Sequence, residues 1–426
     1  MSTHTEGSVP KAYTLGVHRS RHPVDTFRAI SSHFAAVGLT RIADVTGLDT
    51  IGIPVCVAVR PNSRSLSVAQ GKGLTLEQAR VSAAMESIET HHAEFATLQI
   101  RTGSYRELSR TTAVCDPATL NLHPRSIYHD DLPLQWVNGV ELIGRSEILT
   151  PYDLVHCSYL RGSNRRPVFS MSSNGLASGN HRLEAVSHGI CEVVERDASF
   201  FWEWRCLDRE ADTGLLDLET VDSETCRTLL ATFARAGVSV FVWDQTSEIG
   251  MASFACAIIE HRPERLALAL GPYTGFGCHL SKEIALIRAL TEAAQSRLTH
   301  ISGAREDMFR RSYVTYKSDH LAAALTRRIA ASPARVDFAQ LPSLATDTLD
   351  GDVATQLDLL TRAGFDRVIV VDLTDPAIGI PVVRVIVPGM EFRVRHDDRV
   401  PSRLTPRTRA RLLTKNLMRR VLEGRR

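Results

Sequence analysis

A spaced pattern that occurs three times constrains the fold more than any other feature of this sequence. Each copy has a glycine-containing turn, then two small residues four positions apart. Glu follows seven positions after the first small residue, and Glu or Gln follows ten positions after it. Because residues at these separations share one side of a helix, each copy predicts a helix with acidic or amide side chains beside a stripe of small residues, which another group can approach closely. The copies are Ala79, Ala83, Glu86 and Glu89; Ala185, Gly189, Glu192 and Glu195; and Ala285, Ala289, Glu292 and Gln295.

Each predicted helix begins at a residue type that favours helix N-termini, because its side-chain oxygen can accept a free backbone N–H. Gln78, three positions after the first of these residues, gives that copy a capping-box spacing. The central helix is apolar over most of its surface and is predicted to be buried, so its carboxylates need partners. The glycine turns fall within 71–73, 175–179 and 275–277, and the predicted caps are Thr75, Asn180 and Ser281.

Several carboxylates brought together repel one another unless cations lie between them. Oxygen-only ligand sets suit Mg²⁺, which proteins usually bind through a few carboxylates together with nucleotide phosphates. Helix N-termini suit phosphate oxygens. The Gly71-Lys72-Gly73 turn does not have the spacing of a Walker loop. The three helices therefore indicate a Mg²⁺–nucleotide site of another type. The alternative, that the three helices turn their Glu side chains to solvent, is weakened by the repetition of one spacing.

The motifs resemble those of the YcaO family of ATP-dependent enzymes that activate peptide backbones, from about Arg19 to about Asp398. This resemblance implies an α/β (α+β) fold, with a core of mixed sheets flanked by helices and the repeated units converging on a Mg-ATP site. One departure is that the family's first motif commonly ends Glu-Arg, whereas Thr90 follows here. The motifs are Ser82-x-x-x-Glu86-x-x-Glu89, Asn180-x-x-x-Glu184, Glu192-x-x-Glu195-Arg196 and Ala289-Leu-Thr-Glu292-Ala-Ala-Gln295-Ser-Arg297.

The resemblance also implies roles for individual residues. The expected Mg²⁺ ligands are Glu86, Glu89, Glu184, Glu192 and Glu195. The expected nucleotide contacts are Arg19, Ser82, Asn180, Glu184, Arg196, Arg288, Glu292 and Arg297, and the expected catalytic residues are Glu86, Glu192 and Arg288. The sequence identifies no general base. His181 and His188 flank the central helix and could act as an acid or a base, although a hydrogen-bonded structural histidine is the commoner case. The adjacent His91 and His92 could ligate a metal, but their divergent directions on a helix favour a surface role.

Three segments are predicted along the 426 residues: a flexible N-terminus at 1–18, an ATP-binding catalytic domain at 19–400, and a basic helix or tail at 401–426. Within the domain, 301–350 reads as an insertion or cover. Alternating apolar runs predict α/β layers. The predicted helices are 23–37 and 352–363. The predicted strands are 51–60, 64–70, 134–142, 147–155, 167–172, 238–243, 252–260, 266–271, 368–372 and 380–390.

Charge and cysteine usage narrow the function classes. A net charge of +2 argues against bulk binding to nucleic acid or membranes, and no stretch approaches a transmembrane length. The eight cysteines are dispersed without a C-x-x-C pair, and Cys56, Cys191 and Cys256 lie in apolar runs that predict buried thiols. We therefore expect a cytoplasmic protein. The family resemblance implies a peptide or protein substrate, and a homodimer is left open.

The resemblance favours one product over another. The stretch Thr40–Asp49 is similar to YcaO members that work with a TfuA-type partner and external sulfide, whose product is a backbone thioamide. The C-terminus lacks the proline-rich ending common among azoline-forming members, and the 18 residues before Arg19 leave no room for a leader-binding domain, so we expect a TfuA-type or leader-binding partner. The alternatives are an azoline-forming cyclodehydratase on Cys, Ser or Thr peptides, a carboxylate-bridged metal hydrolase, and a Mg-nucleotide-binding regulatory or scaffold protein without turnover.

Overall fold

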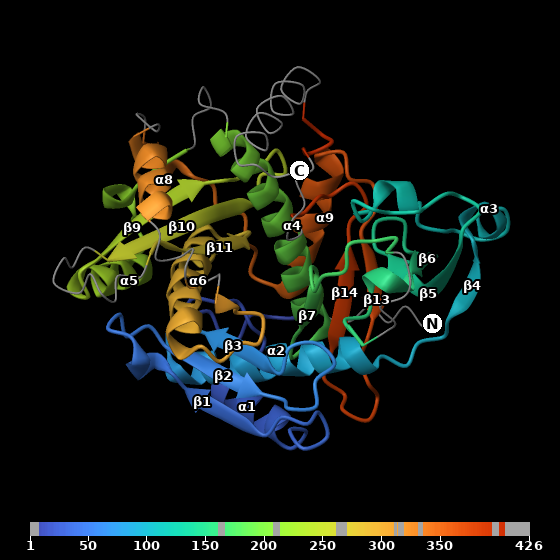
Figure 1. The fold of residues 1–426 in the computed structure, drawn as a ribbon, viewed down its shortest axis with the longest axis horizontal. Helices are drawn as coiled ribbons and strands as arrows, with labels where there is room; N and C mark the ends of the chain where they lie inside the picture. Colours follow the sequence, from blue (N-terminus) through green and yellow to red (C-terminus); the bar gives the residue numbers. More distant parts are fainter. Residues whose placement is uncertain are drawn as a thin grey trace.

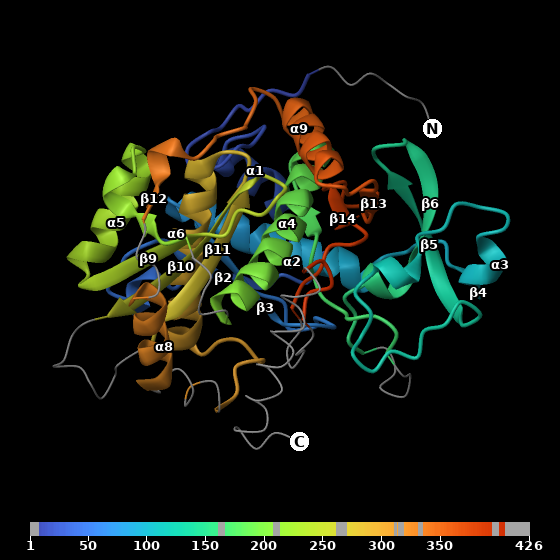
Figure 2. The same cartoon turned by 90° about the horizontal axis from the view of Figure 1, so that it is seen from above.

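The computed structural model describes residues 8–160, 167–207, 214–260, 271–310, 313, 319–330, 335–393 and 400–404. Three long helices lie next to one another in the middle of the protein, as Figures 1 and 2 show from two directions. They are α2 (Leu76–Phe95), α4 (Arg182–Leu207) and α6 (Lys282–Ser302). The other helices are α1 (Pro23–Ser31), α3 (Tyr105–Leu108), α5 (Glu224–Arg235), α8 (Asp319–Ala330) and α9 (Leu349–Arg362).

The sheets surround these helices and are almost entirely antiparallel. One sheet has the order β1-β2-β3, formed by Arg41–Asp44, Val55–Val59 and Val68–Lys72. A second has the order β11-β10-β9, formed by Tyr273–His279, Ala252–Glu260 and Val238–Asp244. A six-stranded sheet has the order β4-β5-β13-β14-β7, with β6 paired to β5; its strands are Arg101–Ser104, Pro133–Glu141, Ile369–Asp372, Val382–Ile386, Leu176–Ser178 and Ser146–Pro151. The short β12 (Val336–Asp337) pairs with β8 (Leu216–Asp217) in parallel. The mixed architecture predicted from the sequence is confirmed.

The three sequence repeats are three strand-to-helix units: β3 with α2, β7 with α4, and β11 with α6. The glycines predicted to form turns at 71 and 275–277 lie instead within strands. A Cβ atom on Gly275 would lie 2.2 Å from the Ala293 amide nitrogen, so only glycine lets this strand approach the helix. Gly189 of α4 is equally crowded, because a Cβ atom there would lie 2.5 Å from Val385 Cγ2 of β14. The small-residue stripes are therefore contact faces for strand backbones.

Two of the three predicted helix caps are confirmed. The Thr75 hydroxyl accepts from the Gln78 N–H at 3.3 Å, and the Ser281 hydroxyl accepts from the Ile284 N–H at 3.3 Å. The prediction for Asn180 was wrong, because the residue after it takes the cap position. His181 Nδ1 accepts from the Leu183 N–H at 3.1 Å.

The predicted N-terminal flexibility does not hold for residues 8–18. Pro10 forms a β-bridge with Thr348, and the Lys11 ammonium lies 2.6 Å from Asp352 Oδ2 of α9. Residues 1–7, and 405–426 of the predicted tail, lie outside the described residues.

The structure confirms some of the other predicted helices and strands and contradicts others. The 238–243 and 252–260 strands pair as β9 and β10, as expected. The 167–172 strand was wrong: Phe169 makes only an isolated bridge to Leu122. Helix α1 ends earlier than predicted, and the 266–271 strand falls almost entirely outside the described residues. His92 is not at the surface, because it is 2% exposed and its Nδ1 lies 2.8 Å from the Ile88 carbonyl oxygen.

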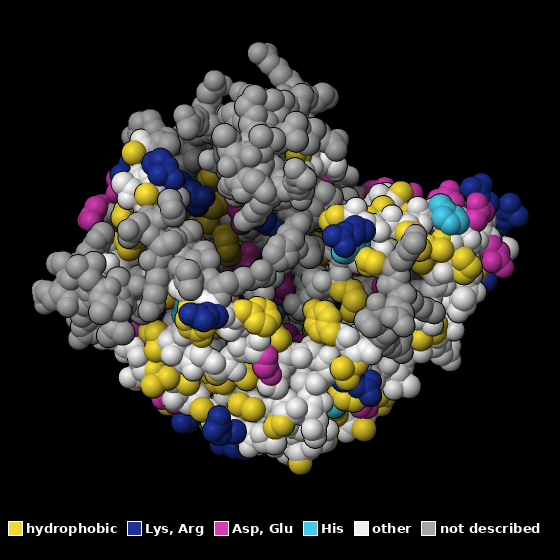
Figure 3. Space-filling view, in the orientation of Figure 1, with side chains coloured by type: hydrophobic (Ala, Val, Ile, Leu, Met, Phe, Trp, Pro, Cys, Tyr) yellow, Lys and Arg dark blue, Asp and Glu magenta, His cyan; other side chains and the backbone are white. Residues whose placement is uncertain are grey.

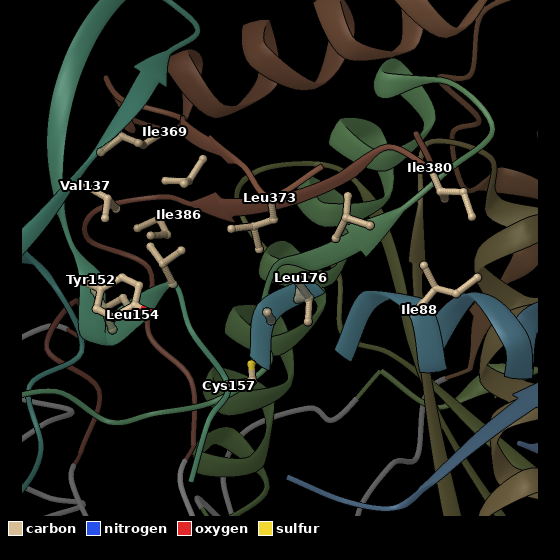
Figure 4. Packing of buried hydrophobic residues seen from close by; sticks show 14 of the residues in the cluster. Ile88, Val137, Tyr152, Leu154, Cys157, Leu176, Ile369, Leu373, Ile380 and Ile386 are labelled. Atoms are coloured by element: carbon tan, nitrogen blue, oxygen red, sulfur yellow. The ribbon is translucent and has the colours of Figure 1, made fainter. Parts of the chain in front are cut away.

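One of the apolar clusters joins the six-stranded sheet to α2. In Figure 4, Val137 of β5, Ile369 of β13 and Ile386 of β14 lie near one another, and Leu176 of β7 leads toward Ile88 of α2. This packing holds β7, which leads into the start of α4, against α2. The three cysteines predicted to be buried are buried. Among the described residues, no helix is both long and apolar enough to cross a membrane.

Candidate functional site

A cavity of about 620 Å³ opens where the three long helices meet. This size is in the range of small-molecule sites. Figure 3 shows the hollow in the middle of the face, with acidic side chains visible inside it. Its walls come from α2, α4, α6, strand β3 and the segment before α1. Six carboxylates line it. Five are the glutamates of the repeats, Glu86, Glu89, Glu192, Glu195 and Glu292, and the sixth is Glu184, which the family resemblance implied.

Backbone and hydroxyl donors orient two of these carboxylates. Glu89 Oε1 accepts from the Ser178 N–H at 2.9 Å and from its hydroxyl at 2.7 Å. Glu184 Oε2 accepts from the Asn180 N–H at 2.8 Å, and its Oε1 accepts from the Ser20 hydroxyl at 2.6 Å. Since Asn180 and Ser20 come from different segments, Glu184 ties the residues before α1 to the start of α4.

The two other oriented carboxylates contact the third unit. Glu195 Oε2 accepts from the Cys278 N–H of β11 at 3.0 Å. Glu292 Oε2 lies 2.8 Å from the Lys72 ammonium, and its Oε1 accepts from the Phe276 N–H at 3.2 Å. Through these contacts the strand of one unit orients the carboxylate of another unit.

The pKa values of four of the cavity carboxylates are raised. Burial raises the pKa of Glu89 to about 8, with repulsion from Glu86 and Glu192 adding to it. Burial likewise raises the pKa of Glu195 to about 6 and that of Glu86 and Glu192 above the ordinary value. Glu86 keeps solvent contact through the cavity, although protein surrounds it. Burial also acts to raise the pKa of Glu292, but the charges of Lys72, Arg196 and Arg288 outweigh it and lower that pKa.

Three arginines lie at the edge of ion-pair distance from these carboxylates. Arg19 Nη1 is 3.9 Å from Glu184, Arg196 Nη2 is 4.0 Å from Glu192, and Arg288 Nη2 is 3.9 Å from Glu195. Such separations leave the guanidinium donors available to another anion. Arg288 Nε is buried without a hydrogen-bond partner in the described chain. The arginines suit a polyphosphate, as guanidinium forks bind phosphate oxygens well.

The donor set also fits Mg²⁺. Carboxylate oxygens are hard ligands, and a divalent cation among them would stabilise their charged forms against the burial and mutual repulsion that raise their pKa values. Among the described residues, one group of three His, Cys, Asp or Glu side chains has its ligand atoms within 4.8 Å of one another, and it does not line the cavity. It is formed by His18, His279 and Asp352, and the Lys11 ammonium already lies 2.6 Å from its carboxylate.

The structure places most of the predicted nucleotide contacts at the cavity, since Arg19, Ser82, Asn180, Arg196 and Arg288 all line it.

Arg297 is the exception and needs correction. Its Nε lies 3.0 Å from each oxygen of Asp49, its Nη2 lies 2.9 Å from Glu260 Oε2, and it does not line the cavity. It fastens α6 to its surroundings, because its donors are directed to these two partners.

Sequence reasoning missed several cavity residues. Lys72 follows Gly71 in β3, and alternation along a strand turns it away from the helix contact toward the cavity. Ser20 and Ser178 hold carboxylates, yet single serines carry no sequence signal. The alternation around Lys72 was the one signal that could have been used.

Comparisons with known proteins agree with a Mg²⁺–nucleotide site in this cavity. A family model described as "YcaO cyclodehydratase, ATP-ad Mg2+-binding" matches residues 70–391. An uncharacterized protein of Methanothermobacter thermautotrophicus is 36% identical over 394 residues, covering 90% of this chain and 97% of that protein. A Rhizobium leguminosarum bv. trifolii protein described as lying in the tfuA 3' region is 35% identical over 381 residues, covering 88% and 89%.

Solved structures share the fold. YcaO from Methanopyrus kandleri bound with AMPPCP and Mg²⁺ superposes with a TM-score of 0.73 at 26% identity, covering 93% of this chain and 98% of that one. A heterocyclase in complex with substrate and cofactor gives a TM-score of 0.72 at 22% identity. That match covers 91% of this chain but 54% of the heterocyclase, and it supports the fold alone.

Proposed function

The chain belongs to the YcaO family, with ATP and Mg²⁺ as its cofactors, and from this premise we propose that it activates a backbone amide of a peptide by ATP-dependent phosphorylation of the amide oxygen. We propose further that sulfide is the incoming nucleophile and a thioamide the product. The observation that carries the proposal is the meeting of Glu86, Glu89, Glu192 and Glu195 in one cavity beside three loosely paired arginines.

The proposed reaction balances as follows. Hydrosulfide forms a C–S bond to the amide carbon, and the carbonyl electron pair moves to oxygen. That oxygen forms a bond to the γ-phosphorus of ATP while the bond to ADP breaks. The C–O bond then breaks with loss of phosphate, the S–H proton is removed, and a C=S bond forms. Phosphate is a far better leaving group than hydroxide or oxide, so ATP supplies the driving force.

The protein contributes charge and position to this reaction. Glu86, Glu89, Glu184, Glu192 and Glu195 would hold Mg²⁺, which when bound neutralises phosphate charge. Arg19, Arg196 and Arg288 would bind phosphate oxygens with their unoccupied donors, together with Ser82 and Asn180. Glu292 is different, because the Lys72 ammonium lies 2.8 Å from its Oε2 and takes the place that a metal cation would occupy. We propose that it positions Lys72 and does not bind metal.

The thioamide product has support from a relative. The Rhizobium protein lies in the tfuA 3' region, which favours a TfuA-type partner for this chain too. The alternative is azoline formation, which the cyclodehydratase description of the family favours. We propose residues 19–400 as the catalytic unit; a cytoplasmic location and a homodimer stay predictions.

The test is a mass measurement. The protein, a TfuA-type candidate partner, a substrate peptide, Mg-ATP and sulfide are incubated together, and the peptide mass is read. Exchange of oxygen for sulfur adds about 16 Da, whereas cyclodehydration removes about 18 Da, as covalent bookkeeping requires. Loss of water from a Cys, Ser or Thr peptide without sulfide would replace the thioamide by an azoline and leave ATP-dependent activation standing.

Binding measurements test the rest of the proposal. Calorimetry should show ATP binding with Mg²⁺ and little binding in excess chelator, because the carboxylates repel an uncompensated triphosphate. Equal affinity in chelator would contradict the carboxylate–metal assignment. ATP binding without phosphate release in the complete mixture would favour a regulatory or scaffold role.

A further inference from the structure

A histidine without an assigned role faces the cavity from the N-terminal part of α4. His188 is four residues from Glu184 and four from Glu192, so all three side chains share one face of the helix. His188 lines the cavity with them. Within the described chain its ring makes no hydrogen bond, and its nitrogens are not among the fully buried polar atoms, so they open into the cavity.

The groups around His188 come from four elements. Arg288 of α6, Arg19 of the segment before α1, Lys72 of β3 and His279 of β11 all act on it. Burial, followed by the positive charges, holds the pKa of His188 well below the ordinary value. The imidazole is therefore neutral at neutral pH and has a ring nitrogen that can accept a proton.

The other proton acceptors of the cavity are less free. Glu89, Glu184, Glu195 and Glu292 accept hydrogen bonds from Ser178, Ser20 and Asn180, Cys278, and Lys72 with Phe276, respectively. Glu86 and Glu192 are assigned to the metal. His188 differs from these carboxylates, because its ring is neutral and both of its nitrogens are accessible from the cavity.

We propose that His188 is the general base of the reaction, which takes the proton from the attacking atom of the nucleophile. The inference rests on the proposed function and deepens it. In thioamide formation the S–H bond breaks, its electron pair forms the second bond of C=S, the proton moves to the imidazole, and phosphate leaves with the C–O bonding pair. The imidazolium then returns the proton to solvent. The same ring can accept the side-chain proton of a Cys, Ser or Thr nucleophile, so the assignment does not depend on which product forms.

Anion binding fits this role. The positive charges of Arg19, Arg288 and Lys72 disfavour the imidazolium while no ligand is present. A polyphosphate on these cations would offset their effect, since an opposite charge nearby favours the charged form of histidine. His188 should then become a stronger base once the nucleotide is in place.

The experiment compares His188→Asn with wild type and with His129→Asn, a control at an exposed position outside the cavity. We expect kcat for peptide modification to fall about 100-fold, the usual contribution of a general base. The dissociation constant for Mg-ATP, measured by calorimetry without peptide, should stay within about twofold of wild type. The control should match wild type in both readouts.

Two results would overturn the assignment: an unchanged kcat, or a kcat loss that is matched by a loss of Mg-ATP affinity and so marks a nucleotide contact. His188→Gln serves as a second variant if His188→Asn does not fold, as judged by circular dichroism. Failure of the proposed function looks different, because wild type itself would then show no ATP-dependent change in peptide mass.

Discussion

A Cβ atom placed on Gly71 would lie 2.0 Å from the amide nitrogen of Ala83, so strand β3 and helix α2 touch backbone to backbone. No real Cβ tolerates such a contact. Glu86 follows Ala83 by three residues, and the contact therefore sets how far its carboxylate stands from β3. The helices have small-residue stripes because strands, not ligands, pack on them.

Replacing Gly71 by Ala should destabilise the protein by about 3 kcal/mol, at the upper end of the cost of overpacking. The added methyl group meets helix backbone, which cannot rotate away. Urea unfolding would measure the change. Gly47→Ala is the matched control, because a Cβ there meets nothing within 4 Å, and it should change stability little. Equal effects at the two positions would contradict the packing argument.

Glu86→Gln and Glu192→Gln should each lower ATP turnover by about 100-fold or more, the scale of a lost electrostatic contact in an active site. Both substitutions keep the side-chain size, so the fold should survive. Phosphate release assays and circular dichroism would check the two statements. Glu147→Gln, at an exposed position of β6, should retain wild-type turnover. Activity within about threefold of wild type for the cavity variants would remove them from the metal site.

In the absence of Mg²⁺, the contribution of Glu195 and Glu89 to stability should fall as pH rises from about 5 to about 8. The pKa values of Glu195 and Glu89 are raised by burial to about 6 and about 8, above the ordinary 4.5. The folded protein thus holds protons that the unfolded chain has already released, and each rise in pH favours unfolding. Thermal unfolding in chelator at several pH values would measure this.

Mg-ATP should reduce that pH dependence, because it binds the folded state with its carboxylates ionised. Glu89→Gln, which cannot ionise, should remove most of the loss above pH 6 even in chelator. The same change in stability between pH 6 and pH 8 in metal-free wild type and in Glu89→Gln would show that the pKa of the Glu89 carboxyl is not raised.

Arg297→Lys should weaken the fold without weakening nucleotide binding. Lysine cannot reproduce the two hydrogen bonds to Asp49 together with the one to Glu260, so we expect a loss of about 2 kcal/mol, typical of a hydrogen bond to a charged group. Mg-ATP affinity, measured by calorimetry, should stay within about twofold. Arg288→Lys is the comparison and should weaken binding clearly. Weaker Mg-ATP binding by Arg297→Lys, together with unchanged binding by Arg288→Lys, would show instead that Arg297 contacts the nucleotide.

The sequence alone determined the repeated units, the identity of the clustered carboxylates and the class of ligand. Helical periodicity is a local property, so the spacing of Glu86 and Glu89, or of Glu192 and Glu195, reveals a shared face before any tertiary contact is known. Local chemistry also identified the caps at Thr75 and Ser281. It failed at Asn180, because the side-chain oxygen of Asn180 accepts from the Thr26 hydroxyl, a residue distant in sequence, while His181 caps the helix.

The tertiary structure decided which polar residues meet. Arg297 matches the arginine of the family motif, yet in the structure it pairs with Asp49, which lies 248 residues away in the sequence. No sequence spacing predicts this pairing. The same holds for Lys72 with Glu292, and for Lys11 with Asp352, which fastens the N-terminal segment to α9. His188 read as a structural histidine until the cavity showed its ring without partners. Long-range contacts are set by how strands and helices pack, and packing depends on the whole chain, whereas periodicity depends on a few turns.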